Sequence, residues 1–73
     1  MEIKEVIKKN GIVLEQLMGG QFKVELEDDK SIAICTLAAR VRRNNIKVLL
    51  GDKVQVEFSP YDLTRGRISY RYK

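Results

Sequence analysis

The sequence contains no histidine and no tryptophan, and it has one cysteine and one proline among 73 residues. Without an imidazole the chain cannot build a Ser–His or Cys–His nucleophile pair, nor a metal site that uses histidine. The single Cys35 excludes an internal disulfide and indicates a reducing compartment, so we expect a cytoplasmic protein, or one of an organelle stroma or matrix. Cys35 lies within a strand pattern, with no base beside it in the sequence, which favours a packing role over a reactive thiol.

Other features of enzymes and membrane proteins are also missing. No apolar run approaches the length that spans a bilayer, and the first residues do not resemble a signal peptide. The glycines are scattered and form no phosphate-binding motif. An acidic cluster between Glu25 and Asp29 sits at a predicted hairpin tip, where it would be a poor cation site and too exposed to tune a general acid. We therefore expect no enzymatic activity, no metal, no cofactor and no membrane association.

What the chain has is basic charge in an uneven distribution. Its formal net charge is +4, and all six arginines lie at or after position 40. An excess of this kind points to an anionic partner. Arginine offers a planar fork to phosphate and also stacks on bases. Two groups stand out: Arg40, Arg42, Arg43 and Lys47, and, near the C-terminus, Arg65, Arg67, Arg71 and Lys73.

The three tyrosines are candidate platforms for unpaired bases. Tyr61 is the best of them because it follows Pro60 in a predicted loop. Tyr70 and Tyr72 also suit the core or rim of a small domain. The candidate RNA-contacting residues are thus Arg40, Arg42, Arg43, Lys47, Tyr61, Arg65, Arg67 and Arg71. The alternative is that these cations form a solvated surface that serves only solubility.

Alternation of apolar and polar residues predicts five strands, over residues 11–17, 21–27, 31–37, 53–58 and 65–73. Turns are expected at residues 18–20, 28–30 and 51–52, and a loop at residues 59–64. Residues 1–10 are either a frayed arm or a short helix. The predicted core is Phe22, Val24, Leu26, Val54, Val56 and Phe58. Ile32 and Ile34 are also expected to point inward, and Ile68, Tyr70 and Tyr72 to share one face of the last strand.

The basic stretch, residues 37–47, is the one segment whose pattern is not plainly β. Ala38, Ala39 and Arg40 are strong helix formers, and Thr36 just before them can cap a helix N-terminus. Asparagine tolerates the left-handed conformation that ends helices, so residues 44–45 are a plausible stop. We predict a short helix over residues 38–44.

Five strands with a short helix between the third and the fourth are typical of the OB-fold, an all-β Greek-key barrel. An SH3-like barrel is the alternative, because strand number alone does not separate small barrels. The length predicts one domain over residues 1–73, and we expect a monomer.

The chain resembles bacterial-type translation initiation factor one over nearly its whole length. The resemblance is carried by residues 11–15, 22–27, 42–49, 51–54 and 59–68, and the last of these, Ser-Pro-Tyr-Asp-Leu-Thr-Arg-Gly-Arg-Ile, is the most specific. The chain differs from the family pattern at residues 38–40, where Ala-Ala-Arg replaces Ser-Gly-Lys. Replacing glycine by alanine favours a more regular helix at this point.

The resemblance implies an RNA-binding OB-fold that occupies the A site of the small ribosomal subunit during initiation. The expected partners are ribosomal RNA of the decoding centre, a neighbouring ribosomal protein, and initiation factors two and three. The matching positions imply RNA contacts by Arg40, Arg42, Arg43, Lys47, Tyr61, Arg65 and Arg67, whereas Arg71 is a candidate on its chemistry alone. A protein-binding adaptor barrel and a general single-strand RNA-binding OB domain remain alternatives.

Overall fold

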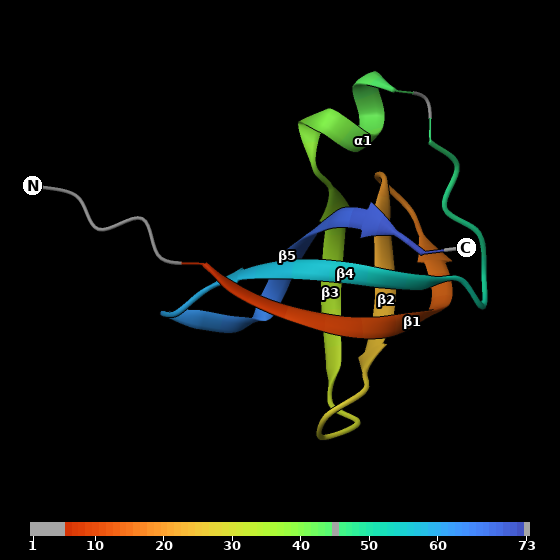
Figure 1. Cartoon of the computed structure of the whole chain (residues 1–73). Coiled ribbons are helices and arrows are strands. Elements are labelled where there is room, and N and C mark those ends of the chain that lie inside the picture. The colour runs from red at the N-terminus through yellow and green to blue at the C-terminus, as the bar shows by residue number, and fades with distance from the viewer. Residues whose placement is uncertain (1–5, 45, 73) are drawn as a thin grey trace, which may run out of the picture.

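The computed structural model describes residues 6–44 and 46–72, which form a closed five-stranded β-barrel with one short helix (Figure 1). Its elements are β1 (Ile7–Leu17), β2 (Gln21–Leu26), β3 (Ile32–Leu37), α1 (Ala39–Arg43), β4 (Lys53–Ser59) and β5 (Asp62–Arg71). The prediction of a five-stranded barrel with a helix between the third and fourth strands is confirmed. With five residues, the helix in this part of the chain is far too short to cross a membrane.

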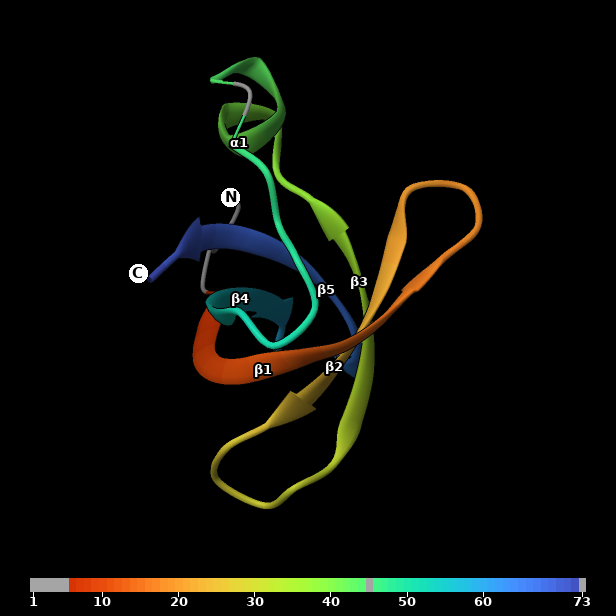
Figure 2. The ribbon, with the colours of Figure 1, turned by 90° about the vertical axis from the view of Figure 1, so that its right-hand side faces the viewer.

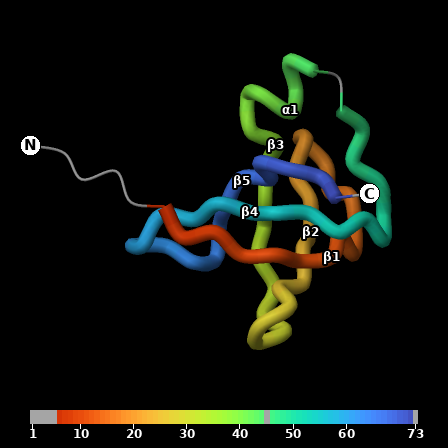
Figure 3. The backbone as a smooth tube through the Cα atoms, viewed as in Figure 1, coloured from red at the N-terminus to blue at the C-terminus, as the bar shows by residue number. Residues whose placement is uncertain are grey.

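The strands follow the order β1-β2-β3-β5-β4 around the barrel, and β4 closes it by pairing with β1. Four of the pairings are antiparallel, while β3 and β5 run parallel to each other. The β1–β2 hairpin rises on the same side of the barrel as α1, and the β2–β3 hairpin projects at the opposite end (Figure 2). The path of the chain shows how α1 bridges the end of β3 and the long segment that leads to β4 (Figure 3).

The barrel interior holds the core that the alternation predicts. All six predicted residues are buried, which confirms the inward faces of β2 and β4. The remaining buried side chains come from β1, β3, α1, the segment before β4, and β5: Val13, Ala33, Cys35, Val41, Val48 and Ile68.

The predicted face of β3 is wrong. Ile32 is 45% exposed, whereas Ala33 and Cys35 are fully buried. The strand carries apolar residues at both parities, so its own sequence leaves the choice open. The barrel decides it by volume, because Cys35 lies opposite Phe22 on one side and Gly66 on the other, and Gly66 in turn lies opposite Phe58. Two small residues fill the space between two large rings, and a larger side chain would overpack this row.

The expected shared face of Ile68, Tyr70 and Tyr72 is also wrong. Ile68 pairs with Val56 and Tyr70 pairs with Gln55, so Ser69 is an extra residue opposite the β4 ladder. A bulge of this kind breaks the two-residue period of a strand. Ile68 is therefore buried while Tyr70 is 55% exposed, and the Tyr70 ring packs edge-on against Tyr72 with centroids 5.0 Å apart.

Two predicted boundaries move. β1 begins at Ile7, so residues 7–10 extend the first strand along β4 and form neither an arm nor a helix. The expected loop over residues 59–64 is a tight turn, since β5 already begins at Asp62. The predicted turn at residues 18–20 is confirmed, with φ of 78° at Gly19 and 76° at Gly20. Residues 1–5, and with them half of the predicted arm, lie outside the described residues, as do Asn45 and Lys73.

The helix predicted in the basic stretch is present, but its ends differ from the prediction. Ala38 occupies the N-terminal cap without a side-chain hydrogen bond, and Thr36 belongs to β3. Asn44 ends the helix with φ of −90°, outside the left-handed region. The helix is anchored by Val41, which is 1% exposed, and by the Ala38 amide, which donates to the Ile68 carbonyl at 3.0 Å. Packing against β5 therefore fixes a helix that is too short to be stable alone.

Phe22→Ala tests the core. Removing a buried phenylalanine side chain costs about 3–5 kcal/mol, a large part of the stability of a small domain. Urea unfolding of the variant should therefore show a much lower midpoint than that of the parent. Met18→Ala is the control, because Met18 is 92% exposed and its loss should change stability by less than about 0.5 kcal/mol. A Phe22→Ala midpoint equal to that of the parent would refute the core assignment.

Gly66→Ala tests the close packing between β4 and β5. A Cβ atom at this position would lie 2.6 Å from Val56 Cγ1, 2.9 Å from the Glu57 carbonyl oxygen and 2.9 Å from Phe58 Cε1. Overpacking of this kind costs about 1–3 kcal/mol. Thermal unfolding should show a clear drop in Tm, while Thr36→Ala on the neighbouring outer face should leave it nearly unchanged. An unaltered Tm for Gly66→Ala would show that the space between Gly66 and β4 accommodates a methyl group.

Candidate nucleic-acid interface

The outer face of β2, β3 and β5 carries two arginines of the second predicted group, Arg65 and Arg67. Arg65 lies opposite Ile34 and Arg67 lies opposite Thr36 across the parallel β3–β5 pair. Both arginines point away from the core, because Gly66 between them faces Val56 and Phe58. Two residues along a strand span about 6.6 Å, so the two guanidinium groups start from neighbouring positions on one surface.

An open groove of about 440 Å³ runs over this face. Its lining mixes apolar and polar groups, including Gln21, Ile34, Thr36, Glu57, Arg65 and Arg67. An apolar floor with cations beside it suits an unpaired nucleic-acid strand, whose bases need a flat apolar surface and whose phosphates need positive charge.

The three arginines of the first predicted group lie on α1, which continues the same surface. Arg42 lines a second depression, of about 320 Å³, together with Thr36, Leu37 and the Gly19–Gly20 turn. Thr36 borders both depressions, so Arg42 and Arg67 lie on either side of it. Arg40 and Arg43 are exposed elsewhere on the helix, away from the buried Val41.

We refer to Arg40, Arg42, Arg43, Arg65 and Arg67 as the basic surface. Within residues 6–44 and 46–72, none of these side chains takes part in an ion pair or a side-chain hydrogen bond. Arg65 lies near Asp62, and Arg67 lies opposite Glu57 across the β4–β5 ladder, but neither acid forms an ion pair with them. The five guanidinium groups are therefore available to an external anion.

Tyr61 stands at the turn between β4 and β5 and is 96% exposed. The turn is shaped by short polar contacts: the Tyr61 amide donates to Ser59 Oγ at 3.2 Å, and the Thr64 hydroxyl donates to Asp62 Oδ1 at 2.6 Å. These hydrogen bonds from Thr64, with a smaller contribution from the Arg65 charge, lower the pKa of Asp62. The turn thus presents an uncovered aromatic ring at the end of β5 that leads to Arg65.

The remaining two candidates differ in their surroundings. Lys47 is exposed in the segment between α1 and β4. Arg71 lies at the far end of β5, where its Nη1 donates to the Lys47 carbonyl at 2.8 Å and lies 3.8 Å from Asp52 Oδ2. The structure therefore does not bring Arg71 together with Arg65 and Arg67, although all three belong to one strand.

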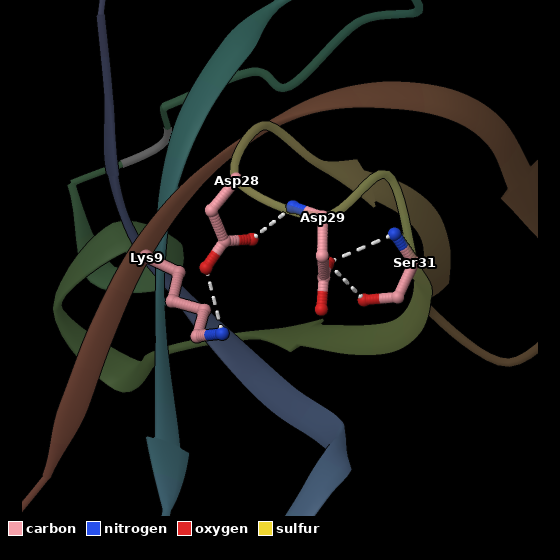
Figure 4. A network of polar contacts seen from close by, with 4 residues as sticks. All are labelled: Lys9, Asp28, Asp29 and Ser31. Atoms are coloured by element: carbon pink, nitrogen blue, oxygen red, sulfur yellow. Dashed lines mark hydrogen bonds and ion pairs between the residues drawn. The ribbon is translucent and has the colours of Figure 1, made fainter.

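The acidic cluster lies at the opposite end of the barrel from α1, at the β2–β3 tip, and its two aspartates have partners (Figure 4). Lys9 Nζ is 2.8 Å from Asp28 Oδ2, and this hydrogen bond raises the pKa of Lys9. Asp29 Oδ1 accepts hydrogen bonds from the Ser31 hydroxyl and amide, which lower the pKa of Asp29. In the described part of the chain, no group of three or more acidic, cysteine or histidine residues is arranged to hold a metal ion.

Cys35 is fully buried in the barrel, next to the basic surface but facing the other way. Burial raises the pKa of its thiol to about 11, so the thiol is protonated at neutral pH. A protonated thiol enclosed by side chains is neither a nucleophile nor a metal ligand. Its position opposite Phe22 and Gly66 accounts for it as a packing residue.

Sequence reasoning missed the β3 side of the site. Ile34 and Thr36 line the grooves, and Gln21 contributes from β2, but none of them was a candidate. Their outward direction follows from the phase of β3, which only the packing of the barrel reveals. The rule that apolar residues point inward concealed Ile34, which is half-buried and lies opposite Arg65 in the neighbouring strand.

Comparison with known proteins shows the family of this chain. The family model described as "Translation initiation factor 1A / IF-1" matches residues 1–73. The solution structure of translation initiation factor one from the Wolbachia endosymbiont strain TRS of Brugia malayi is 37% identical to this chain, with a TM-score of 0.78 over 93% of this chain and 79% of that one. YjeQ from Thermotoga maritima is 25% identical with a TM-score of 0.75, over 92% of this chain and 23% of that one.

The family match covers the whole sequence, and the similarity to the Wolbachia factor extends to both sequence and fold. The same barrel shape in YjeQ forms only a part of a longer chain. The resemblance drawn from the sequence motifs is thereby confirmed. This chain belongs to the translation initiation factor 1A / IF-1 family and is a translation initiation factor with an OB-fold.

Proposed function

We propose that this translation initiation factor binds the small ribosomal subunit at the A site, through ribosomal RNA of the decoding centre and a neighbouring ribosomal protein. Bound there, it occludes the A site during initiation and acts together with initiation factors two and three. It works as a monomer, by binding and not by catalysis. Its place is the cytoplasm, or the stroma or matrix of an organelle.

The observation that carries the proposal is the continuity of the basic surface. Arg65 and Arg67 line one depression, Arg42 lines the other, and Thr36 borders both. Arg40 and Arg43 are exposed on the same short helix as Arg42. Ribosomal RNA offers closely spaced phosphates and unpaired bases, and a surface with both arginines and an apolar floor accommodates both. Membership in the family agrees with this choice of partner.

The mechanism follows from which groups are exposed. The arginines neutralise phosphates and release their counterions, which supplies most of the affinity. Tyr61 adds stacking on an unpaired base beside the strand that carries Arg65 and Arg67. Because the strands form a closed barrel, the bound factor keeps other ligands out of the space that it occupies.

Salt dependence tests the phosphate contacts. Binding of the labelled chain to purified small ribosomal subunits should weaken with salt, with a log–log slope of about 0.7–0.9 per phosphate contact. Arg42→Ala, Arg65→Ala and Arg67→Ala should each weaken binding and reduce the slope by about one such contact.

The matched control is Lys30→Gly at the acidic tip. It also removes one positive charge, and the φ of 61° at Lys30 is one that glycine adopts readily. This variant should keep the slope of the parent. If the arginine variants behave like Lys30→Gly, the basic surface serves only solubility and a protein-binding adaptor becomes the better account.

Tyr61→Ala tests stacking separately from charge. Loss of one base–aromatic stack costs about 1–3 kcal/mol of binding free energy, while the salt slope stays that of the parent. Tyr70→Ala is the control, because Tyr70 is also exposed but packs against Tyr72 at the other end of β5. Equal affinities of Tyr61→Ala and the parent for small subunits would show that the ring does not touch RNA.

A further inference from the structure

The segment that joins α1 to β4 has no regular secondary structure over residues 46–52, yet it is held at several points. The Ile46 amide donates to the Val41 carbonyl at 3.2 Å, Val48 is buried, and the Gly51 amide donates to the Val13 carbonyl at 2.8 Å. This segment is the C-terminal support of α1, the five-residue helix that carries three arginines of the basic surface.

Arg71 and Asp52 hold the middle of this segment. Arg71 Nη1 donates to the Lys47 carbonyl at 2.8 Å and lies 3.8 Å from Asp52 Oδ2. The same Asp52 oxygen accepts the Leu49 amide at 2.8 Å, and the Asp52 amide donates to the Leu49 carbonyl at 3.1 Å. One guanidinium and one carboxylate therefore tie together three points of the chain, namely the end of β5, residues 47–49 and the residue before β4.

We propose that Arg71 and Asp52 act as a clip that positions residues 46–52, and through them α1, for RNA binding, and that Arg71 itself makes no RNA contact. We call this pair the Arg71–Asp52 clip. The inference rests on the proposed function, since it assigns a positioning role within the same RNA-binding surface. It replaces the interpretation of Arg71 as a phosphate-binding residue.

The clip matters because α1 cannot hold its own geometry. A helix of five residues gains little from its internal hydrogen bonds, so its orientation depends on what precedes and follows it. β3 and the Ala38–Ile68 hydrogen bond fix the preceding end. The clip is the charged contact that fixes the following segment, and its side chains are only 34% and 27% exposed. Partial burial lowers the screening of this pair by salt.

The sign of one substitution separates the two roles of the pair. A carboxylate repels phosphate, so removing Asp52 should tighten RNA binding if electrostatics alone matters. The clip predicts the opposite, because Asp52→Ala frees both Leu49 and Arg71. Arg71→Ala should weaken binding by roughly five- to tenfold, the lower end of typical coupling between sites, with the salt slope unchanged.

The experiment measures small-subunit binding across a salt series for Arg71→Ala, Asp52→Ala and the double variant. Both single variants should bind more weakly than the parent, with the same slope of affinity against salt. Because the two residues act as one unit, the affinity of the double variant should be no lower than that of the weaker of the two single variants. Asp28→Ala is the matched control, because it removes an acid paired with Lys9 at the opposite end and should not weaken binding.

A second readout needs no RNA. Amide hydrogen exchange at Leu49 should be about tenfold faster or more in free Arg71→Ala than in the free parent, since Asp52 loses its partner. This result separates failure of the clip from failure of the proposed function: a parent that does not bind small subunits would refute the function and leave the exchange result standing. Arg71→Lys covers the case in which Arg71→Ala does not fold, and it should show the same two effects in weaker form.

Two results would overturn the clip. One is tighter binding by Asp52→Ala than by the parent. The other is a slope that falls by about 0.7–0.9 in Arg71→Ala, with Leu49 exchange unchanged, which would make Arg71 a phosphate contact.

Discussion

The close packing at Gly66 is the constraint on which the rest of the structure depends. Gly66 lies between Cys35 of β3 and Phe58 of β4, and a Cβ atom at this point would collide with Val56 and with the Glu57 backbone. Because the glycine lets β5 approach β4 closely, β5 keeps its ladder with β4 while it pairs in parallel with β3 on its other side. The same contact turns the residues on either side of it, Arg65 and Arg67, to the outer surface. The core and the basic surface thus lie on the two faces of one strand pairing.

Charge is separated along the molecule. The basic surface lies on α1 and the outer face of β5, and the acidic cluster lies at the β2–β3 tip, which projects at the opposite end of the barrel. At the tip, Asp28 forms an ion pair with Lys9 and Asp29 accepts a hydrogen bond from Ser31. The arginines of the basic surface form no ion pair with the described residues around them. A net charge of +4 is modest, but this arrangement makes the charge distribution differ between the two ends of the molecule. A polyanion is attracted more strongly to the end that carries the unpaired arginines than to the tip, which favours one orientation of the encounter before contact is made.

The sequence predicted those parts of the fold that depend on local pattern. Strands with clean alternation, such as β2 and β4, and the turn at Gly19–Gly20 need only neighbouring residues to be specified. The face of β3 did not follow, since Ile32 and Ile34 are as apolar as the inner residues, and only the rings of Phe22 and Phe58 decide which pair fits. The bulge at Ser69 likewise arises from the ladder with β4. Among the candidate site residues, composition was enough to single out the arginines. It did not separate Arg71, whose guanidinium donates to the Lys47 carbonyl and lies near Asp52, from the unpaired ones.

In the proposed function, the factor meets its ribosomal partner with α1, the β4–β5 turn and the outer face of β5. Amide hydrogen exchange of the chain, free and bound to purified small ribosomal subunits, tests this claim most directly. If the factor binds with this surface, exchange should be slower on binding in residues 39–44 and 60–67, with no change in residues 27–31 at the acidic tip. Slower exchange at residues 27–31, with residues 39–44 and 60–67 unchanged, would contradict it.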